Sequence, residues 1–186
     1  KGICDWDFVH DGDLKLINQP IDVLGLNYYS TNLLAMSDRP QFPQSTEAST
    51  APGASDIDWL PTDGPHTQMG WNIDPDALYN TLVRLNDDYD HIPLVVTENG
   101  RACPDEVEVG PDGVKMVHDD DRIDYLRRHL EAVHRAIEEG ANVIGYFVWS
   151  LMDNFEWAFG YDRRFGLTYV DYDTEERIRK DSYNWY

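Results

Sequence analysis

The clearest sign of the fold class is the stretch Ile92-Pro-Leu-Val-Val-Thr-Glu-Asn-Gly100, a short β-branched run that ends in a turn signal. Two similar stretches, Ile21–Asn27 and Asn142–Trp149, lie on either side of it in the chain. All three are nearly continuous apolar runs without clean alternation, which is typical of parallel strands covered on both faces. We therefore predict three buried parallel strands.

Helical patterns lie between these predicted strands. Asp74-Pro75-Asp76 is a typical helix start, with an N-cap residue, proline at the first helical position and an acid in the first turn. Between Asp120 and Glu139, apolar residues recur every three or four positions, and Gly140 follows where a left-handed cap is common. Strands that alternate with helices predict an α/β fold with helical crossovers. Residues 37–65 and 101–119 are rich in proline, glycine and polar residues, and we predict long loops there.

The composition limits the kinds of partner. The 186 residues include 15 Lys and Arg against 35 Asp and Glu, a net charge of −20, which argues against nucleic acid binding. The longest uncharged stretch, residues 140–152, is too short to span a bilayer. Cys4 and Cys103 do not form a disulfide framework, so reduced thiols and a bacterial cytoplasmic location are expected.

The histidines offer no metal-ligand spacing, so we expect no metal and no cofactor. We predict that all six lie at the surface: His10, His66, His91, His118, His129 and His134.

Reactive and aromatic side chains gather where the predicted strands end. They are Asn27, Tyr28 and Tyr29 after the first strand, Glu98 and Asn99 after the second, and Trp149, Asp153, Glu156 and Trp157 after the third. Parallel α/β folds carry their active sites at the carboxyl ends of the strands. Glu98 could there act as a nucleophile oriented by the Tyr29 hydroxyl. A carboxylate that only caps a turn is the alternative for a single glutamate.

Residues 149–165 interleave aromatic rings with charged and amide side chains, so this segment is not uniformly buried. Flat rings beside carboxylates can form a sugar-binding surface, because a pyranose face packs on a ring while its hydroxyls bind charged groups. The alternative is that the rings belong to the core.

Two motifs carry a resemblance to a known family. Residues Tyr146–Tyr161, YFVWSLMDNFEWAFGY, and Val95-Val-Thr-Glu-Asn-Gly100 resemble the signatures of the family 1 glycoside hydrolases, the β-glucosidases. Supporting stretches are Leu24–Tyr29, Met69–Trp71 and Arg122–Leu126. The resemblance implies a (β/α)₈ barrel, an α/β fold. Residues 1–186 would be its last three β/α units, part of a single catalytic barrel whose strands one to five are absent from this chain.

The resemblance also implies the reaction and its residues. It is that of a retaining β-glucosidase acting on small β-glucosides and cello-oligosaccharides through a covalent glycosyl-enzyme. Glu98 would be the nucleophile, and Tyr29 would hydrogen-bond its carboxylate. The glycone would be bound by Asn27 near the 2-hydroxyl, Trp149 as a platform, Glu156 at the 4- and 6-hydroxyls, Trp157 at the 3-hydroxyl and Phe165 closing the pocket.

The family's acid/base glutamate, in an Asn-Glu-Pro motif, is missing from this chain. Retaining hydrolysis needs two carboxyl groups, so we expect the isolated chain to be inactive and to need the N-terminal part of the same barrel as its partner. Unpaired strand edges could instead drive self-association into a homo-oligomer. Two alternatives stay open: a sugar-binding fragment without chemistry, and a small enzyme that pairs Glu98 with Asp153 or Glu156 as the acid.

Overall fold

A computed structural model describes residues 5–36 and 57–186 of the chain, which divides into two compact units. One unit comprises residues 1–21 and 32–63, and the other comprises residues 22–31 and 64–186. The second unit holds the parallel strands and all of the predicted site residues.

The first unit contains helix α1 (Asp13–Ile17) and the antiparallel strands β2 (Leu33–Met36) and β3 (Ile57–Leu60). Leu33 pairs with Leu60 and Met36 with Ile57. Strand β3 corrects the prediction that residues 37–65 form one irregular loop, because cross-strand pairing stabilises a segment whose flanking composition is polar. Residues 37–56 of that predicted loop lie outside the described residues.

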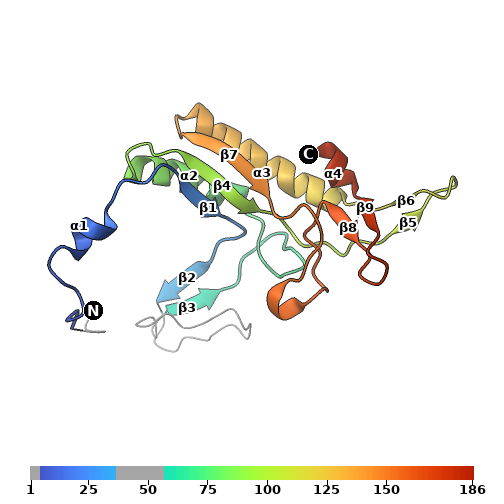
Figure 1. Ribbon diagram of the computed structural model, residues 1–186, viewed down its shortest axis with the longest axis horizontal. Coiled ribbons are helices and arrows are strands. Elements are labelled where there is room, and N and C mark those ends of the chain that lie inside the picture. The colour runs from blue at the N-terminus through green and yellow to red at the C-terminus, as the bar shows by residue number, and fades with distance from the viewer. Residues whose placement is uncertain (1–4, 37–56) are drawn as a thin grey trace. The chain divides into compact units, whose positions relative to one another are not determined.

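The second unit is built on a parallel sheet of β1 (Leu24–Asn27), β4 (Leu94–Asn99) and β7 (Val143–Val148), in the order β1-β4-β7 (Figure 1). The three predicted parallel strands are confirmed, and β1 begins later than expected. Strand β4 is longer than predicted at its carboxyl end, since it includes Glu98 and Asn99. These two residues continue the ladder by pairing with Asn27 and Val148, which overrides the local turn signal.

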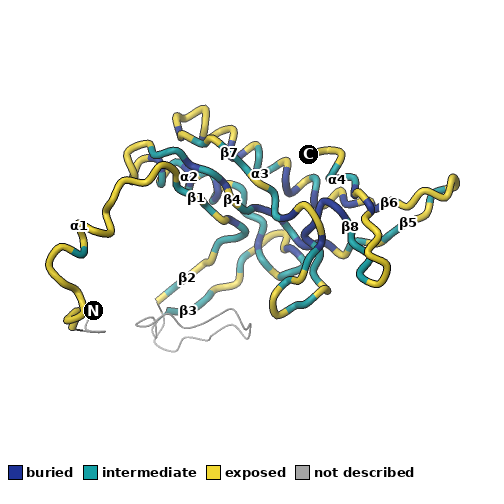
Figure 2. Tube along the Cα trace, in the orientation of Figure 1, coloured by how far each residue is buried: buried dark blue, intermediate teal, exposed yellow. Residues whose placement is uncertain are grey.

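Helices α2 (Pro75–Asp88) and α3 (Asp120–Glu138) cover one face of this sheet (Figure 1). Asp74 caps α2 as predicted, with Oδ1 accepting a hydrogen bond of 3.0 Å from the Ala77 amide. The core between helices and sheet, dark blue in Figure 2, comprises Tyr28, Leu78, Leu82, Leu94, Val96, Val133, Ala136 and Ala141. Each fully buried leucine or valine contributes about 1.5–3 kcal/mol, so this layer fixes the positions of the strand ends.

Shorter elements complete the second unit. They are β5 (Glu108–Val109), β6 (Lys115–Met116), the 3₁₀ helix η1 (Trp157–Phe159), β8 (Thr168–Val170), β9 (Arg177–Arg179) and α4 (Asp181–Trp185). The antiparallel pair β5-β6 interrupts the predicted loop 101–119. The charged composition of residues 177–186 alone predicts one last helix whose charges form a solvated face. Instead β9 pairs with β8, only α4 is helical, and Lys180 between them is buried.

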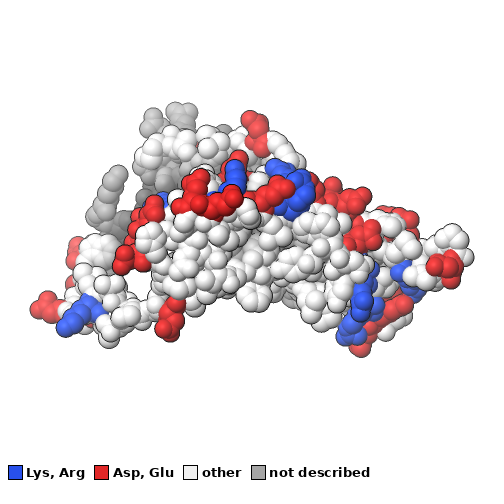
Figure 3. All heavy atoms as spheres, turned by 90° about the horizontal axis from the view of Figure 1, so that it is seen from above, with Lys and Arg blue, Asp and Glu red and all other residues white. Residues whose placement is uncertain are grey.

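Charged side chains on the face drawn in Figure 3 are mixed in sign. Acidic side chains are spread over this view, and the groups of Lys and Arg lie beside them. Exposed ion pairs of the second unit include Arg127 with Glu131 and Arg135 with Asp76. Such exposed pairs contribute little to stability, typically below about 1 kcal/mol each.

His129 corrects the prediction that all histidines lie at the surface. Its side chain is fully buried on α3, where Nδ1 lies 2.7 Å from the Tyr125 carbonyl oxygen and the ring stacks on the Tyr125 ring at 3.9 Å. Burial lowers the pKa of His129 to about 4, with Arg128 also lowering it and Asp74 acting in the opposite direction. The imidazole is therefore neutral at pH 7 and donates through Nδ1.

Because the His129 imidazole is buried in its neutral form, we expect the protein to lose stability in mild acid. The pKa in the unfolded chain, near 6.5, lies above the folded value, so the unfolded state takes up the proton first. The contribution of the neutral His129 side chain to the free energy of unfolding is complete above pH 6.5, and it falls by about 3 kcal/mol as the pH decreases from 6.5 to 4. Urea titrations at several pH values between 6.5 and 4 measure this effect. As the pH decreases, the free energy of unfolding should fall less for His129→Phe than for the unmodified protein. His134→Phe is the matched control, because the His134 side chain is 72% exposed, and equal acid sensitivity of both variants would contradict the assignment.

Candidate active site at the strand ends

The carboxyl ends of β1, β4 and β7 meet at one edge of the sheet. Asn27 is the register partner of Glu98, and its Oδ1 accepts a hydrogen bond of 2.6 Å from the Thr97 hydroxyl. The backbone amide of Trp149, which follows β7, donates to the Asn99 carbonyl at 3.0 Å. The structure thus brings Asn27, Glu98 and Trp149 to the same edge, as the strand order requires.

Glu98 is paired with a tyrosine from the neighbouring strand. The Tyr29 hydroxyl donates to Glu98 Oε2 at 2.8 Å, and both side chains are half-buried. Burial is the main cause that raises the pKa of Tyr29, followed by the hydrogen bond to Glu98 and by the charges of Glu98 and Glu156. Tyr29 therefore stays protonated and holds one carboxylate oxygen, while Glu156 lies within electrostatic range of the pair.

Aromatic rings form a wall beside this pair. The Tyr29 ring lies 5.4 Å from the Trp71 ring and 6.1 Å from the Phe165 ring, and Trp71 and Phe165 are 6.2 Å apart between centroids. Phe165 was predicted as a site residue, whereas Trp71 was not. The sequence feature that could have indicated Trp71 is the Met69-Gly70-Trp71 stretch, which supports the family resemblance but does not follow a predicted strand.

The backbone of Trp149 packs against the turn that follows Glu98. The Trp149 carbonyl oxygen occupies the space that a β-carbon at Gly100 would need, so only glycine fits there. The peptide bond between Trp149 and Ser150 is cis. This contact holds the chain after β7 directly over the end of β4.

Glu156 and Trp157 lie at the start of η1. The Glu156 amide donates to the Gly160 carbonyl at 2.6 Å, which closes a tight turn around the 3₁₀ helix. The Trp157 indole is 82% exposed, so its face is open to a ligand. Phe165 is packed on Tyr29, whereas the structure places Trp157 at the surface.

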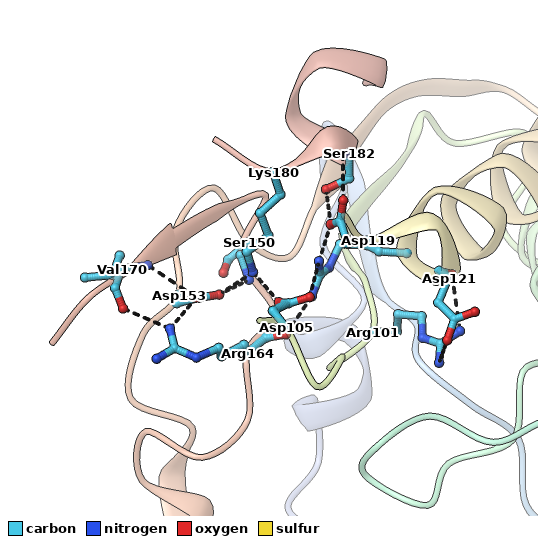
Figure 4. Close-up of polar contacts among 12 residues, drawn as sticks. Arg101, Asp105, Asp119, Asp121, Ser150, Asp153, Arg164, Val170, Lys180 and Ser182 are labelled. Atoms are coloured by element: carbon cyan, nitrogen blue, oxygen red, sulfur yellow. Dashed lines mark hydrogen bonds and ion pairs between the residues drawn. The ribbon is translucent and has the colours of Figure 1, made fainter. Parts of the chain in front are cut away.

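Asp153 belongs to a buried ion network and not to the strand-end site (Figure 4). Its Oδ1 accepts from Lys180 Nζ at 2.8 Å, and its Oδ2 accepts from Arg164 at 2.6 Å. The Gly166 amide is a further donor at 2.9 Å. Both carboxylate oxygens of Asp153 are thus occupied by two cations and an amide within the network, which argues against the alternative in which Asp153 acts as the acid toward a substrate.

Neither a metal centre nor a membrane span is found in the part of the chain that the structure describes. Over residues 5–36 and 57–186, three His, Cys, Asp or Glu side chains never come together in a way that could hold a metal ion. Within the same residues, the helices are too short or too polar to cross a bilayer.

Comparison with known protein families identifies the family of this chain. The family model described as "Glycosyl hydrolase family 1" matches residues 4–186. The chain belongs to glycosyl hydrolase family 1.

Relatives and solved structures in this family are longer than the chain. It is 83% identical over its whole length to the "Bifunctional beta-D-glucosidase/beta-D-fucosidase" of Bifidobacterium breve, of which it covers 40%. It is 44% identical to "Beta-glucosidase A" of Thermotoga maritima over 94% of the chain and 35% of the relative. The solved "Beta-glucosidase from Thermotoga maritima in complex with deoxynojirimycin" superposes with a TM-score of 0.79 at 44% identity, again over 94% and 35% of the two chains.

These superpositions confirm the predicted fold class. The solved relatives are (β/α)₈ barrels, and the three strands and their helices match a part of such a barrel. The chain spans about two fifths or less of the length of these relatives.

Proposed function

We propose that this chain is the part of a retaining β-glucosidase that carries the nucleophile and most of the glycone subsite. The observation that supports this best is the Tyr29–Glu98 pair at the carboxyl edge of the sheet. A half-buried carboxylate held on one oxygen by a neutral hydroxyl keeps its other oxygen free to attack. The names of the relatives, glucosidases from several bacteria, support the same reaction.

In this proposal, hydrolysis proceeds by double displacement. Glu98 attacks the anomeric carbon, a glycosyl ester forms at its carboxylate, and the bond to the leaving group breaks as that group takes a proton from a second carboxyl group. A water molecule, deprotonated by that second group, then attacks the same carbon and releases Glu98. The second carboxyl group must come from outside this chain, because the chain has no Asn-Glu-Pro sequence.

The remaining site residues would bind the sugar. We assign Trp149 to the platform under the ring, Asn27 to the 2-hydroxyl, Glu156 to the 4- and 6-hydroxyls, and Trp157 to the 3-hydroxyl. Phe165 would close the pocket next to Tyr29, with which it is in ring contact. The exposed indole of Trp157 is free to make such a contact.

Small β-glucosides and cello-oligosaccharides are the proposed substrates, and the bacterial cytoplasm is the proposed location. One relative is named a β-glucosidase and β-fucosidase, and another from Thermotoga neapolitana is named a 1,4-β-D-glucan glucohydrolase. The N-terminal part of the same barrel is the proposed partner of this chain.

A chimera tests this proposal. In it, the chain replaces the matching segment of the Bifidobacterium breve relative, which is 83% identical to it. We expect the chimera to hydrolyse an aryl β-glucoside. We also expect a 2-deoxy-2-fluoroglucoside to label Glu98 covalently, which mass spectrometry of the peptides would show. The chain alone should give no turnover, because it lacks the second carboxyl group.

Other results would separate the alternatives. A folded chimera that binds glucose-like inhibitors but never labels Glu98 would favour the sugar-binding fragment. Turnover by the isolated chain equal to that of the chimera would contradict the claim that the chain needs a partner.

A further inference from the structure

Asn99, the residue after the proposed nucleophile, is fully buried and connects three other elements. Its Nδ2 donates to the Tyr28 carbonyl at 2.8 Å and to the Tyr125 hydroxyl at 3.0 Å. Its Oδ1 accepts from the Tyr146 hydroxyl at 2.5 Å. One amide side chain on β4 is therefore bound to the end of β1, to α3 and to β7.

These hydrogen bonds also reach the backbone next to the two paired residues, Tyr29 and Glu98. The Tyr125 hydroxyl, which accepts from Asn99, lies 3.3 Å from the Tyr29 carbonyl oxygen and donates to it. The Tyr28 amide donates to the Glu98 carbonyl at 2.9 Å. Asn99 thus holds the peptides before and after Tyr29 relative to the peptide that carries Glu98.

We propose that Asn99 is a positioning residue for the reaction proposed above, on which this inference rests. Its amide sets the backbone register between the ends of β1 and β4, and so keeps the Tyr29 hydroxyl 2.8 Å from Glu98. Asn99 does not touch the substrate. It acts through Tyr28 and Tyr125, and its effect is on the direction in which the Glu98 carboxylate points.

The geometry explains why an asparagine is needed at this position. The site requires two donors on one side and one acceptor on the other, which is the hydrogen-bonding capacity of an amide. Burial raises the pKa of Tyr125 and of Tyr146, so both hydroxyls stay protonated and serve as partners. Because the amide is buried, losing its donors leaves the Tyr28 carbonyl with one partner fewer, and the strand end is free to shift. A displacement of about 1 Å at a reacting group can lower the rate about 100-fold.

Asn99→Asp in the chimera is the test. The shape is kept and Tyr146 still has its acceptor, but both donors are lost. We expect kcat per labelled site and the rate of labelling by the fluoroglucoside to fall about 10- to 100-fold at neutral pH, with KM changed less than about threefold. The difference in kcat per labelled site between variant and parent should become smaller at acid pH, because the protonated aspartic acid side chain of the variant regains an O–H donor toward the Tyr28 carbonyl.

Asn86→Asp is the matched control. Asn86 is also buried, and its Oδ1 accepts from the Asn142 amide at 3.0 Å near the start of β7, at the opposite end of the sheet. Its Nδ2 lies 2.7 Å from Nδ1 of His91, and an ionised aspartate at this position has no donor for that contact. This variant should lose stability and yet keep kcat per labelled site. If Asn99→Asp behaves in the same way, losing stability but keeping kcat per labelled site, its role is only structural and the inference is overturned.

Glu98→Gly separates the two proposals. If this variant keeps its turnover, the proposed function is wrong and the role of Asn99 is wrong with it. If it is inactive while Asn99→Asp turns over normally per labelled site, the proposed function stands and only the positioning role is rejected.

Discussion

Replacing Glu98 with glycine is expected to lower the turnover of the chimera on an aryl β-glucoside by on the order of 10⁵-fold. The carboxylate is the group to which the new bond to the anomeric carbon forms, so no other side chain in the pair replaces it. Tyr29 stays protonated because of its burial and its carboxylate neighbour, and it is a poor nucleophile in that form. The measurement is kcat/KM for variant and parent.

A small anion should restore part of the lost activity. Azide can enter the space that the Glu98 side chain leaves, form a bond to the anomeric carbon and displace the aryl group, which gives an α-glucosyl azide. Glu106→Gly is the control, because Glu106 is exposed and outside the strand-end site, and its turnover should stay within about twofold of the parent. A Glu98→Gly variant with near-normal kcat/KM would refute the assignment of the nucleophile.

Replacing Lys180 with methionine is expected to destabilise the protein by about 3–5 kcal/mol. Lys180 is fully buried, and its Nζ donates to Asp105 at 2.5 Å and to Asp153 at 2.8 Å (Figure 4). Methionine fills most of the space but leaves these two carboxylates close together with one cation fewer. Arg122 and Arg164 still neutralise them in part, at 2.8 Å from Asp105 and 2.6 Å from Asp153.

Lys115→Met provides the comparison for this network. Lys115 forms an ion pair with Glu176, but both side chains are more than two fifths exposed, so its loss should cost no more than about 1 kcal/mol. Urea unfolding of both variants in the chimera gives the two values. If both variants lose the same free energy of unfolding, burial of the Lys180 network adds nothing to the stability of the protein.

The buried ion network also contacts the segment that carries Phe165. Arg122 on α3 donates to the Arg164 carbonyl at 2.9 Å, next to Phe165 in the aromatic wall. Asp119 accepts from the amide and the hydroxyl of Ser182 at 2.8 and 2.5 Å, which fastens α4 to the start of α3. These contacts hold the segment after β7 against the helix layer that supports β4.

Much of the fold follows from order along the chain. Short apolar runs gave the three parallel strands, and the Asp74-Pro75 start and the spacing within residues 120–139 gave the two long helices. These signals are local, since they depend on neighbours within one turn or one strand. Glu98 and Tyr29 could be paired in advance because parallel strands deliver their carboxyl ends to the same edge.

Other features depended on residues far apart in the chain. Lys180, expected on a solvated face, is buried because Asp105 and Asp153 reach it across 75 and 27 positions. His129 is buried because α3 turns that face toward Tyr28, and Trp71 joins the site from a segment that is not a strand. The amide of Asn99 meets partners 71 and 47 positions away. Local pattern carries no information about such partners, because the free energy of burying a polar group depends on what the folded chain places around it.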